Sequence, residues 1–308
     1  MIFMLTDLFY WVLNISILGG ITGLLVALLR RIPRLPRFAA YLLWGLPLLR
    51  FWLPFGVASH FSLLSLVSKY ATKTVVIWHR TTGEPILSST NVTQYAENYF
   101  PITFKTNLLE TIFETAAVVW AILAAAAILA SFALYFLTKR ELRDAKHIKG
   151  NLWTSDKITS PAVYGIFHPR ILLPAWISER DLPYILAHES THIRRRDNLW
   201  RVVAVVTACV HWFNPLAWLF LRWFFADMEL ACDAKVLKRL GNARSKEYAA
   251  ALLNCAAGKS HFASAFGGAR IRVRIENILS YKKISLLSAL ACGAFLAAVA
   301  FVLITNAV

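Results

Sequence analysis

Four long stretches of the chain are almost entirely apolar. A helix that crosses a bilayer needs roughly 20 such residues, and the stretches cover residues 8–29, 38–57, 115–137 and 284–305. Hydrophobic residues make up 58% of the whole sequence. The pattern therefore predicts a mainly α-helical membrane protein with about four transmembrane helices.

The spans divide the chain into three parts. Residues 1–138 form an N-terminal membrane domain with three transmembrane helices and an extracytoplasmic loop at 58–107. Residues 139–283 are polar enough to form a water-facing domain, and residues 284–308 carry the last transmembrane helix. Two short strands are expected around His168, which makes the water-facing domain α+β with a small β-sheet.

Basic residues cluster at the ends of the apolar stretches. The formal net charge is +16, from 33 Lys and Arg against 17 Asp and Glu. The segment 30–37 and the segment 139–143 are both rich in arginine or lysine, which places them in the cytoplasm and both termini outside. Arginines between the apolar residues of 267–278 predict an amphipathic helix at the membrane surface. No recognisable nucleic-acid-binding module accompanies these charges, so no direct contact with nucleic acid is expected.

The strongest chemical signal is an H-E-x-x-H pentapeptide formed by His188, Glu189 and His192. On a helix, residues four apart share a face, so both imidazoles can bind one Zn²⁺ at about 2.0–2.1 Å. The glutamate beside the first ligand can accept a proton from a metal-bound water. The motif alone arises by chance in about a few per cent of chains of this length. The alternative reading is an ordinary charged helix turn.

A catalytic zinc site needs a third protein ligand, and Glu229 supplies one. Apolar arms at 199–210 and 216–226 flank Pro215, which predicts two antiparallel helices that return Glu229 to the level of His192. Asp233 lies one turn further on the same face and can accept the outward N–H of a ligating histidine.

Two alternatives accompany this ligand set. Glu229 can also be an ordinary acid on the second helix. Cys232 faces another side of that helix, and we interpret it as a small buried hydrophobic residue rather than a ligand.

Four motifs, in this order, resemble the BlaR/MecR family of bacterial integral-membrane zinc metallopeptidases, which act as β-lactam sensor-transducers and antirepressors. They occupy Tyr164–Pro174, His188–Asp197, His211–Pro215 and Glu229–Asp233.

The resemblance implies a gluzincin-type site with one Zn²⁺ per chain. His188, His192 and Glu229 would hold the metal, Glu189 would act as the base, and Asp233 and Asp197 would support the ligands from behind. A strand near such sites commonly offers an edge to an extended substrate. We assign that role, as a hypothesis, to Tyr164, Gly165 and Ile166.

The expected function is a membrane-embedded zinc endopeptidase in the bacterial cytoplasmic membrane, with its peptidase domain in the cytoplasm. The resemblance suggests a transcriptional repressor, of the winged-helix type, as the protein substrate, and self-cleavage within residues 260–268. Membrane lipid is the other expected partner, and assembly as a homodimer stays open.

The sequence departs from the best-known family members in one respect. It stops at Val308, without the penicillin-binding domain that follows the last span in those sensors. We therefore do not carry β-lactam sensing over, since the chain is either a short family member or a truncated one. Two alternatives remain: a zinc protease for quality control of membrane proteins, and a non-catalytic membrane signalling protein.

Overall fold

The computed structural model describes residues 2–32, 35–53, 59, 62, 107–257, 264–282 and 285–305. The expected extracytoplasmic loop at 58–107 lies outside these residues, apart from positions 59, 62 and 107. The expected self-cleavage zone lies outside them at 260–263.

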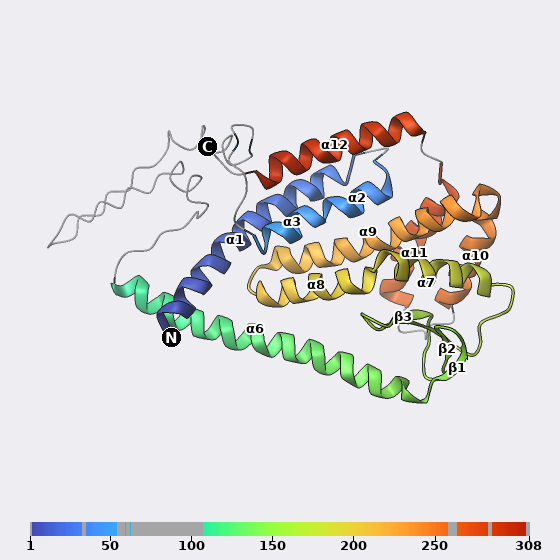
Figure 1. Ribbon diagram of the computed structural model, residues 1–308, viewed down its shortest axis with the longest axis horizontal. Coiled ribbons are helices and arrows are strands. Elements are labelled where there is room, and N and C mark those ends of the chain that lie inside the picture. The colour runs from blue at the N-terminus through green and yellow to red at the C-terminus, as the bar shows by residue number, and fades with distance from the viewer. Residues whose placement is uncertain are drawn as a thin grey trace.

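Three helices of the described residues are long and apolar enough to cross a membrane. They overlap three of the four expected spans, although α1 and α6 begin several residues earlier than expected. Figure 1 shows α6 running along one side of the molecule and α12 along the opposite side. The three are α1 (Ile2–Leu29), α6 (Asn107–Glu141) and α12 (Leu286–Ile304).

The expected span at 38–57 is not continuous in its described part. It consists of two short helices, α2 (Arg37–Leu43) and α3 (Gly45–Arg50), which meet at Trp44. The indole of Trp44 is buried and donates a hydrogen bond to Asp227, 2.7 Å away on another helix. This segment is therefore held by packing and polar contacts inside the protein.

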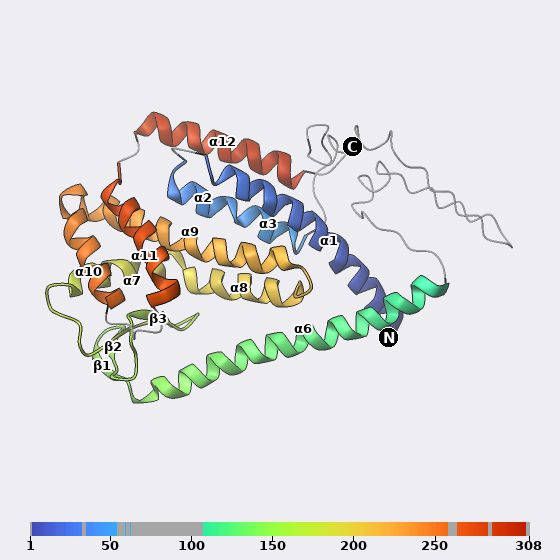
Figure 2. The ribbon, with the colours of Figure 1, turned by 180° about the vertical axis from the view of Figure 1, so that it is seen from behind.

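The remaining helices form the layer that carries the H-E-x-x-H motif. As expected, the helix after that motif ends before Pro215, where Asn214 accepts a hydrogen bond from the Leu216 backbone and begins the next helix. The two arms of this hairpin lie side by side in Figures 1 and 2. The helices are α7 (Leu182–Arg195), α8 (Asp197–Val210), α9 (Pro215–Leu240), α10 (Ser245–Ala257) and α11 (Ser264–Leu279), with short 3-10 turns η1 (Leu142–Asp144) and η2 (Asn242–Arg244).

A four-stranded mixed sheet lies beside α7. Its strand order is β1-β2-β4-β3, with β2 parallel to β4 and the other two pairs antiparallel. The two strands expected around His168 are β3 and β4, and β3 lies at an edge of the sheet. Gly165 and Ile166 follow β3 in the turn, so our assignment of them to the edge strand was wrong. The strands are β1 (Lys146–Lys149), β2 (Leu152–Thr154), β3 (Ala162–Tyr164) and β4 (Arg170–Leu173).

One apolar cluster joins the membrane helices to the hairpin. It contains Val26 of α1, Trp44 beside α2, and Phe220 and Met228 of α9, all buried, together with Leu303 of α12. Apolar burial is the main driving force of such packing. The hairpin and the N-terminal helices therefore form a continuous core.

The expected amphipathic helix exists as α11, and part of its apolar face packs inside the protein. Ile271, Ile275 and Ile278 pack against a second buried cluster that includes Cys232 and Tyr248. Val273 and Leu279 of the same helix are exposed. Apolar periodicity shows that a face is covered without showing what covers it, so a position of α11 at the membrane surface stays a prediction.

Close contact between α1 and α9 requires glycine at position 23. A Cβ added to Gly23 would lie 2.0 Å from Cε2 of Phe220, whose ring packs against Trp44. We expect Gly23→Ala to lower the thermal unfolding midpoint, because overpacking a dense core costs about 1–3 kcal/mol. Gly45→Ala, where an added Cβ meets nothing within 4 Å, is the matched control and should unfold like wild type. Equal midpoints for both variants would refute this packing constraint.

Candidate metal centre

His188 and His192 lie on one face of α7, and both side chains are buried. Their Nε2 atoms face each other at 3.1 Å. Each Nδ1 has its own partner, at 2.8 Å for His188 with the Tyr248 hydroxyl and 2.6 Å for His192 with Asp197. When both Nδ1 atoms carry the proton, both Nε2 atoms turn lone pairs toward one point. A shared cation stabilises that arrangement.

Glu229 of α9 brings its carboxylate to the same point. Oε2 lies 3.3 Å from Nε2 of His188, and Oε1 lies 3.6 Å from Nε2 of His192. Nitrogen and oxygen ligands of a tetrahedral zinc ion stand roughly 3.3–3.4 Å apart, as follows from bonds of about 2.0–2.1 Å. The three side chains therefore fit a zinc ion. Burial by itself raises the pKa of Glu229, but the two histidines and Arg274 outweigh it and hold the pKa well below its usual range.

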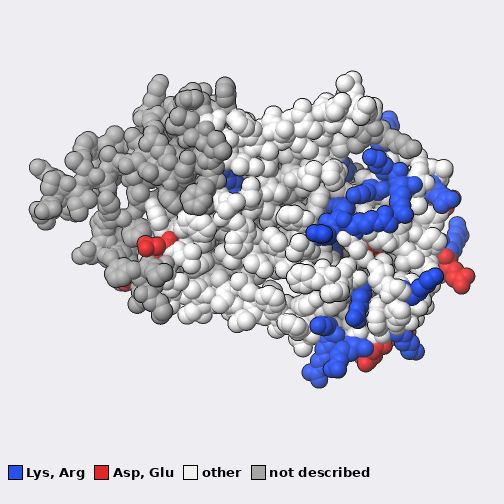
Figure 3. Space-filling view, viewed as in Figure 1, with Lys and Arg blue, Asp and Glu red and all other residues white. Residues whose placement is uncertain are grey.

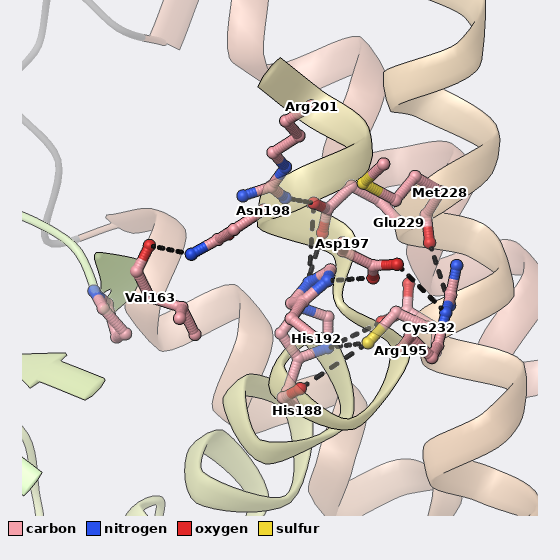
Figure 4. A network of polar contacts seen from close by, with 12 residues as sticks. Val163, His188, His192, Arg195, Asp197, Asn198, Arg201, Met228, Glu229 and Cys232 are labelled. Carbon is pink, nitrogen blue, oxygen red and sulfur yellow. Dashed lines mark hydrogen bonds and ion pairs between the residues drawn. The ribbon is translucent and has the colours of Figure 1, made fainter. Parts of the chain in front are cut away.

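Cys232 is a competing ligand. Its Sγ and one ligand atom each of His188 and His192 lie within 4.8 Å of one another. However, Sγ makes its 3.6 Å contacts with Nδ1 and the backbone oxygen of His188, on the side away from Glu229. Figure 4 shows the sulfur and the Glu229 carboxylate approaching the histidines from different directions. We favour Glu229 because it faces both Nε2 atoms.

Asp197 anchors His192 from behind. The chain turns between α7 and α8 at Arg196, whose φ of 56° is the one positive value at a non-glycine residue in the described part of the chain. This turn places the buried Asp197 carboxylate against Nδ1 of His192. Burial alone lowers the pKa of His192, but the hydrogen bond to Asp197 is among the contacts that raise it well above its ordinary value. The other Asp197 oxygen accepts from the hydroxyl of Tyr41 at 3.3 Å, which links α2 to the centre.

Asp233 supports His188 mainly through a tyrosine. Its Oδ1 lies 3.3 Å from Nδ1 of His188, but the Tyr248 hydroxyl is closer to both and donates to Asp233 at 2.6 Å. Burial, together with the charge of Asp233, raises the pKa of Tyr248 well above its ordinary value, so the hydroxyl keeps the proton that it donates.

Arg274 of α11 contacts both Asp233 and Glu229. Its Nε and one terminal nitrogen each donate to Asp233 at 2.8 Å, a bidentate pair. Its other terminal nitrogen lies 3.4 Å from Oε2 of Glu229. Burial by itself raises the pKa of Asp233, and the Arg274 guanidinium more than reverses this effect.

The centre opens into a cavity of about 260 Å³. Glu189 lines this cavity beside both histidines, and Arg201 of α8 lines it while bonding Glu229 at 2.7 Å. Strand β3 forms part of the wall through Ala162 and Val163. A molecule bound in this cavity would meet the two histidines, Glu229 and Glu189 together.

Asn198 fixes the position of β3 beside the cavity. Its amide nitrogen donates to the backbone oxygens of Val163 at 3.2 Å and Gly165 at 2.8 Å. The contact with Val163 is visible in Figure 4. The hydrogen bonds turn these two oxygens toward α8, so this part of the strand edge is already occupied.

Sequence reasoning missed several polar residues of the centre. They reach it from α2, α8, α10 and α11, at positions with no motif spacing relative to the histidines. A single arginine or tyrosine in an amphipathic helix gives no local signal of its partner. The missed residues are Tyr41, Asn198, Arg201, Tyr248 and Arg274.

The profile of the family described as BlaR1 peptidase M56 matches residues 10–278. The chain belongs to this family. The match extends from the first membrane helix to α11, so it includes every residue of the metal centre. The resemblance to the BlaR/MecR proteins is thereby confirmed.

Among curated M56 relatives, the chain is 29% identical over 162 residues to the regulatory protein BlaR1 of Bacillus licheniformis, which is 49% of this chain and 27% of that protein. It is 31% identical over 119 residues to the methicillin resistance mecR1 protein of Staphylococcus aureus, which is 37% of this chain and 20% of that protein. The chain thus aligns with about a quarter of the length of these relatives. Most of each relative lies outside the aligned part, so we do not assign the functions of these whole proteins to the chain.

The third ligand can be tested with two isosteric changes. We expect Glu229→Gln to lower zinc affinity by more than the 10–100-fold typical of supporting residues, because it removes a charged ligand. Cys232→Ser should keep about one zinc per chain. Chelator competition on the purified full chain measures both. Loss of zinc from Cys232→Ser with retention in Glu229→Gln would reverse our choice of ligand.

Arg274 and Arg272 give a matched pair on one helix. Arg274 is partly buried and pairs with Asp233 and Glu229 in the centre, whereas Arg272 is exposed and pairs only with Glu276 among the described residues. Arg274→Gln leaves Asp233 buried without its counter-charge, a change that costs about 3–5 kcal/mol. We therefore expect a lower unfolding midpoint and weaker zinc binding for Arg274→Gln, and wild-type values for Arg272→Gln. Identical behaviour of the two variants would remove Arg274 from the centre.

Proposed function

We propose that the chain is a membrane-embedded zinc endopeptidase that cuts a cytoplasmic protein. The observation that carries the proposal is the convergence of two imidazole Nε2 atoms and the Glu229 carboxylate on one point, beside Glu189, in a cavity. A structural zinc site is closed by four protein ligands, whereas a catalytic site keeps one position open. Residues 139–283 form the peptidase region in this proposal, and residues 1–138 and 284–308 the membrane parts.

The residues have distinct roles in this proposal. Zinc, when bound, supplies a Lewis acid and lowers the pKa of the attacking water. Glu189 accepts the proton of that water on its carboxylate and passes it to the leaving amine. Asp197 and Tyr248 keep the two Nδ1 atoms protonated, so that both Nε2 atoms offer lone pairs to a metal. Nη2 of Arg274 lies 3.3 Å from Nε2 of His188 and would turn to Asp233 and Glu229 when metal binds.

An extended substrate has an edge on which to pair. Strand β3 is at the edge of the sheet and lines the cavity together with Ser160 and Pro161. Asn198 already occupies the oxygens of Val163 and Gly165, and alternation along the strand leaves the Pro161 oxygen and the Val163 N–H on the same edge. We propose that a substrate pairs with these two groups. This places the edge before Tyr164, rather than at Tyr164 to Ile166 as first proposed.

Charge distribution supports a cytoplasmic peptidase region in a bacterial cell membrane. Figure 3 shows Lys and Arg gathered over one end of the molecule, where the peptidase helices and the sheet lie, and a broad uncharged surface beside it. Positive charge marks the cytoplasmic side of membrane proteins. A repressor is our proposed substrate because relatives are named for regulation and methicillin resistance.

One observation favours a second candidate function, a non-catalytic membrane signalling protein. Cys232 would be a fourth protein ligand if its sulfur moved to the Nε2 side of the histidines, and four ligands would close the site. The distances in the structure favour the open, three-ligand arrangement.

Glu189→Gln separates catalysis from metal binding. We expect the variant to keep about one zinc per chain and to cut at least about 100-fold more slowly, since a general base contributes about 10²–10⁴ to the rate. Self-cleavage and casein cleavage by the full chain in liposomes give the rate, and elemental analysis gives the zinc. A wild-type protein that binds zinc yet cuts neither substrate, or a variant that cuts at the wild-type rate, would contradict the proposal.

A further inference from the structure

A second cavity, outside the metal centre, lies where α6 leaves its apolar stretch. Its volume is about 690 Å³, within the range of small-molecule sites. Its walls come from the C-terminal end of α6, the turn between β3 and β4, and Trp153 of β2. The apolar stretch of α6 is a candidate membrane span that ends at Asp144, so this cavity lies at the end of that span, where headgroups are expected if α6 crosses a membrane.

Cations line this cavity without a balancing acid. Lys139 near the end of α6 and Arg143 of η1 are four residues apart, and Arg170 of β4 lines the same cavity. The lining contains no Asp or Glu, and none of the three cations forms an ion pair with a described residue. The neighbouring acid, Asp144, is bonded to Lys157. Arg170 also stacks on the ring of Trp153, with 4.5 Å from its guanidinium carbon to the ring centroid.

The turn that forms one wall is held firmly against α6. The ring of Tyr164 stacks on that of Tyr135, with centroids 5.0 Å apart, and its hydroxyl donates to the Tyr135 backbone oxygen at 2.6 Å. Gly165 has a φ of +100°, and a Cβ added there would lie 2.7 Å from the backbone oxygen of His168. Only glycine fits this position, so the shape of the turn is specified by the sequence.

An apolar ring marks the tip of the same turn. Phe167 is 87% exposed, which leaves a whole aromatic side chain in contact with solvent. Figures 1 and 2 show the turn extending from the sheet alongside α6. An aromatic ring beside a membrane span is stabilised when it enters the interface between headgroups and acyl chains.

We propose that this cavity binds the phosphodiester headgroup of an anionic phospholipid, with Lys139, Arg143 and Arg170 as its counter-charges and Phe167 among the acyl chains. Basic pockets beside membrane helices bind such headgroups through charge and shape together. Because β3 lines both cavities, through Val163 on one side and Tyr164 on the other, the lipid would also steady the strand beside the metal centre. The inference needs only that α6 cross a membrane and is independent of the peptidase proposal.

The test is lipid retention by the purified, delipidated full chain in neutral detergent. Native mass spectrometry after incubation with equimolar dioleoylphosphatidylglycerol and dioleoylphosphatidylcholine measures the preference. We expect wild type to retain the anionic lipid in preference to the zwitterionic one. In the double variant Arg143→Gln with Arg170→Gln, the ratio of anionic to zwitterionic lipid retained should fall roughly fivefold for each cation removed. The matched control, Lys146→Gln with Lys149→Gln, removes two exposed charges from β1 outside the cavity and should keep it.

Three results would overturn the proposal. Equal loss in both double variants would mean that diffuse surface charge attracts the lipid. Displacement of the lipid by millimolar inorganic phosphate or glycerol phosphate would indicate a site for small anions. Absence of any preference in wild type would rule the site out. Unfolding midpoint and zinc content serve as folding controls, and Lys139→Gln provides a second variant if the arginine pair fails to fold.

Discussion

Three carboxylates on one helix, α9, organise the polar contacts of the structure. Asp227 and Asp233 are buried and Glu229 is partly buried, and an unpaired carboxylate in such surroundings would cost several kcal/mol. Each recruits cations or donors from a different part of the chain. Asp227 pairs with Arg30, which directly follows α1, at 2.8 Å and accepts a hydrogen bond from the indole of Trp44 at 2.7 Å. Glu229 and Asp233 pair with histidines of α7 and with arginines of α8 and α11. The charges of α9 therefore help to position the helices that surround it.

Other buried polar contacts link the membrane helices to the metal centre and to one another. Tyr41 of α2 donates to Asp197, which holds His192, so a membrane-side helix lies two hydrogen bonds from a candidate metal ligand. At the opposite end of the bundle, the buried Arg50 donates to the last backbone oxygens of α12, at 2.7–2.9 Å. Arg50 thereby ties α3 to the end of the last span. Tyr41, Asp197 and His192 are all buried, so a displacement of α2 would disturb the hydrogen bonds that hold His192.

Much of the fold was predictable because its signals are local. Apolar length predicted α1, α6 and α12, the break at Pro215 predicted the α8–α9 hairpin, and the H-E-x-x-H spacing placed two imidazoles on one face of α7. Helical periodicity also predicted that α11 has an apolar face. It could not distinguish a membrane surface from the protein core, and the structure places Ile278 in the core.

The sequence by itself determined the three long apolar helices, the break at Pro215 and the two histidines on one face of α7, since apolar length and residue spacing along a single helix settle each of these. Only the tertiary structure decided that Tyr248 comes between His188 and Asp233, that Arg274 lies in the centre, and that Asn198 covers part of the β3 edge. Such pairs join residues far apart in the chain, where no periodicity relates them. Which residues form such a pair depends on which buried charges and strand edges lie together once the helices have packed.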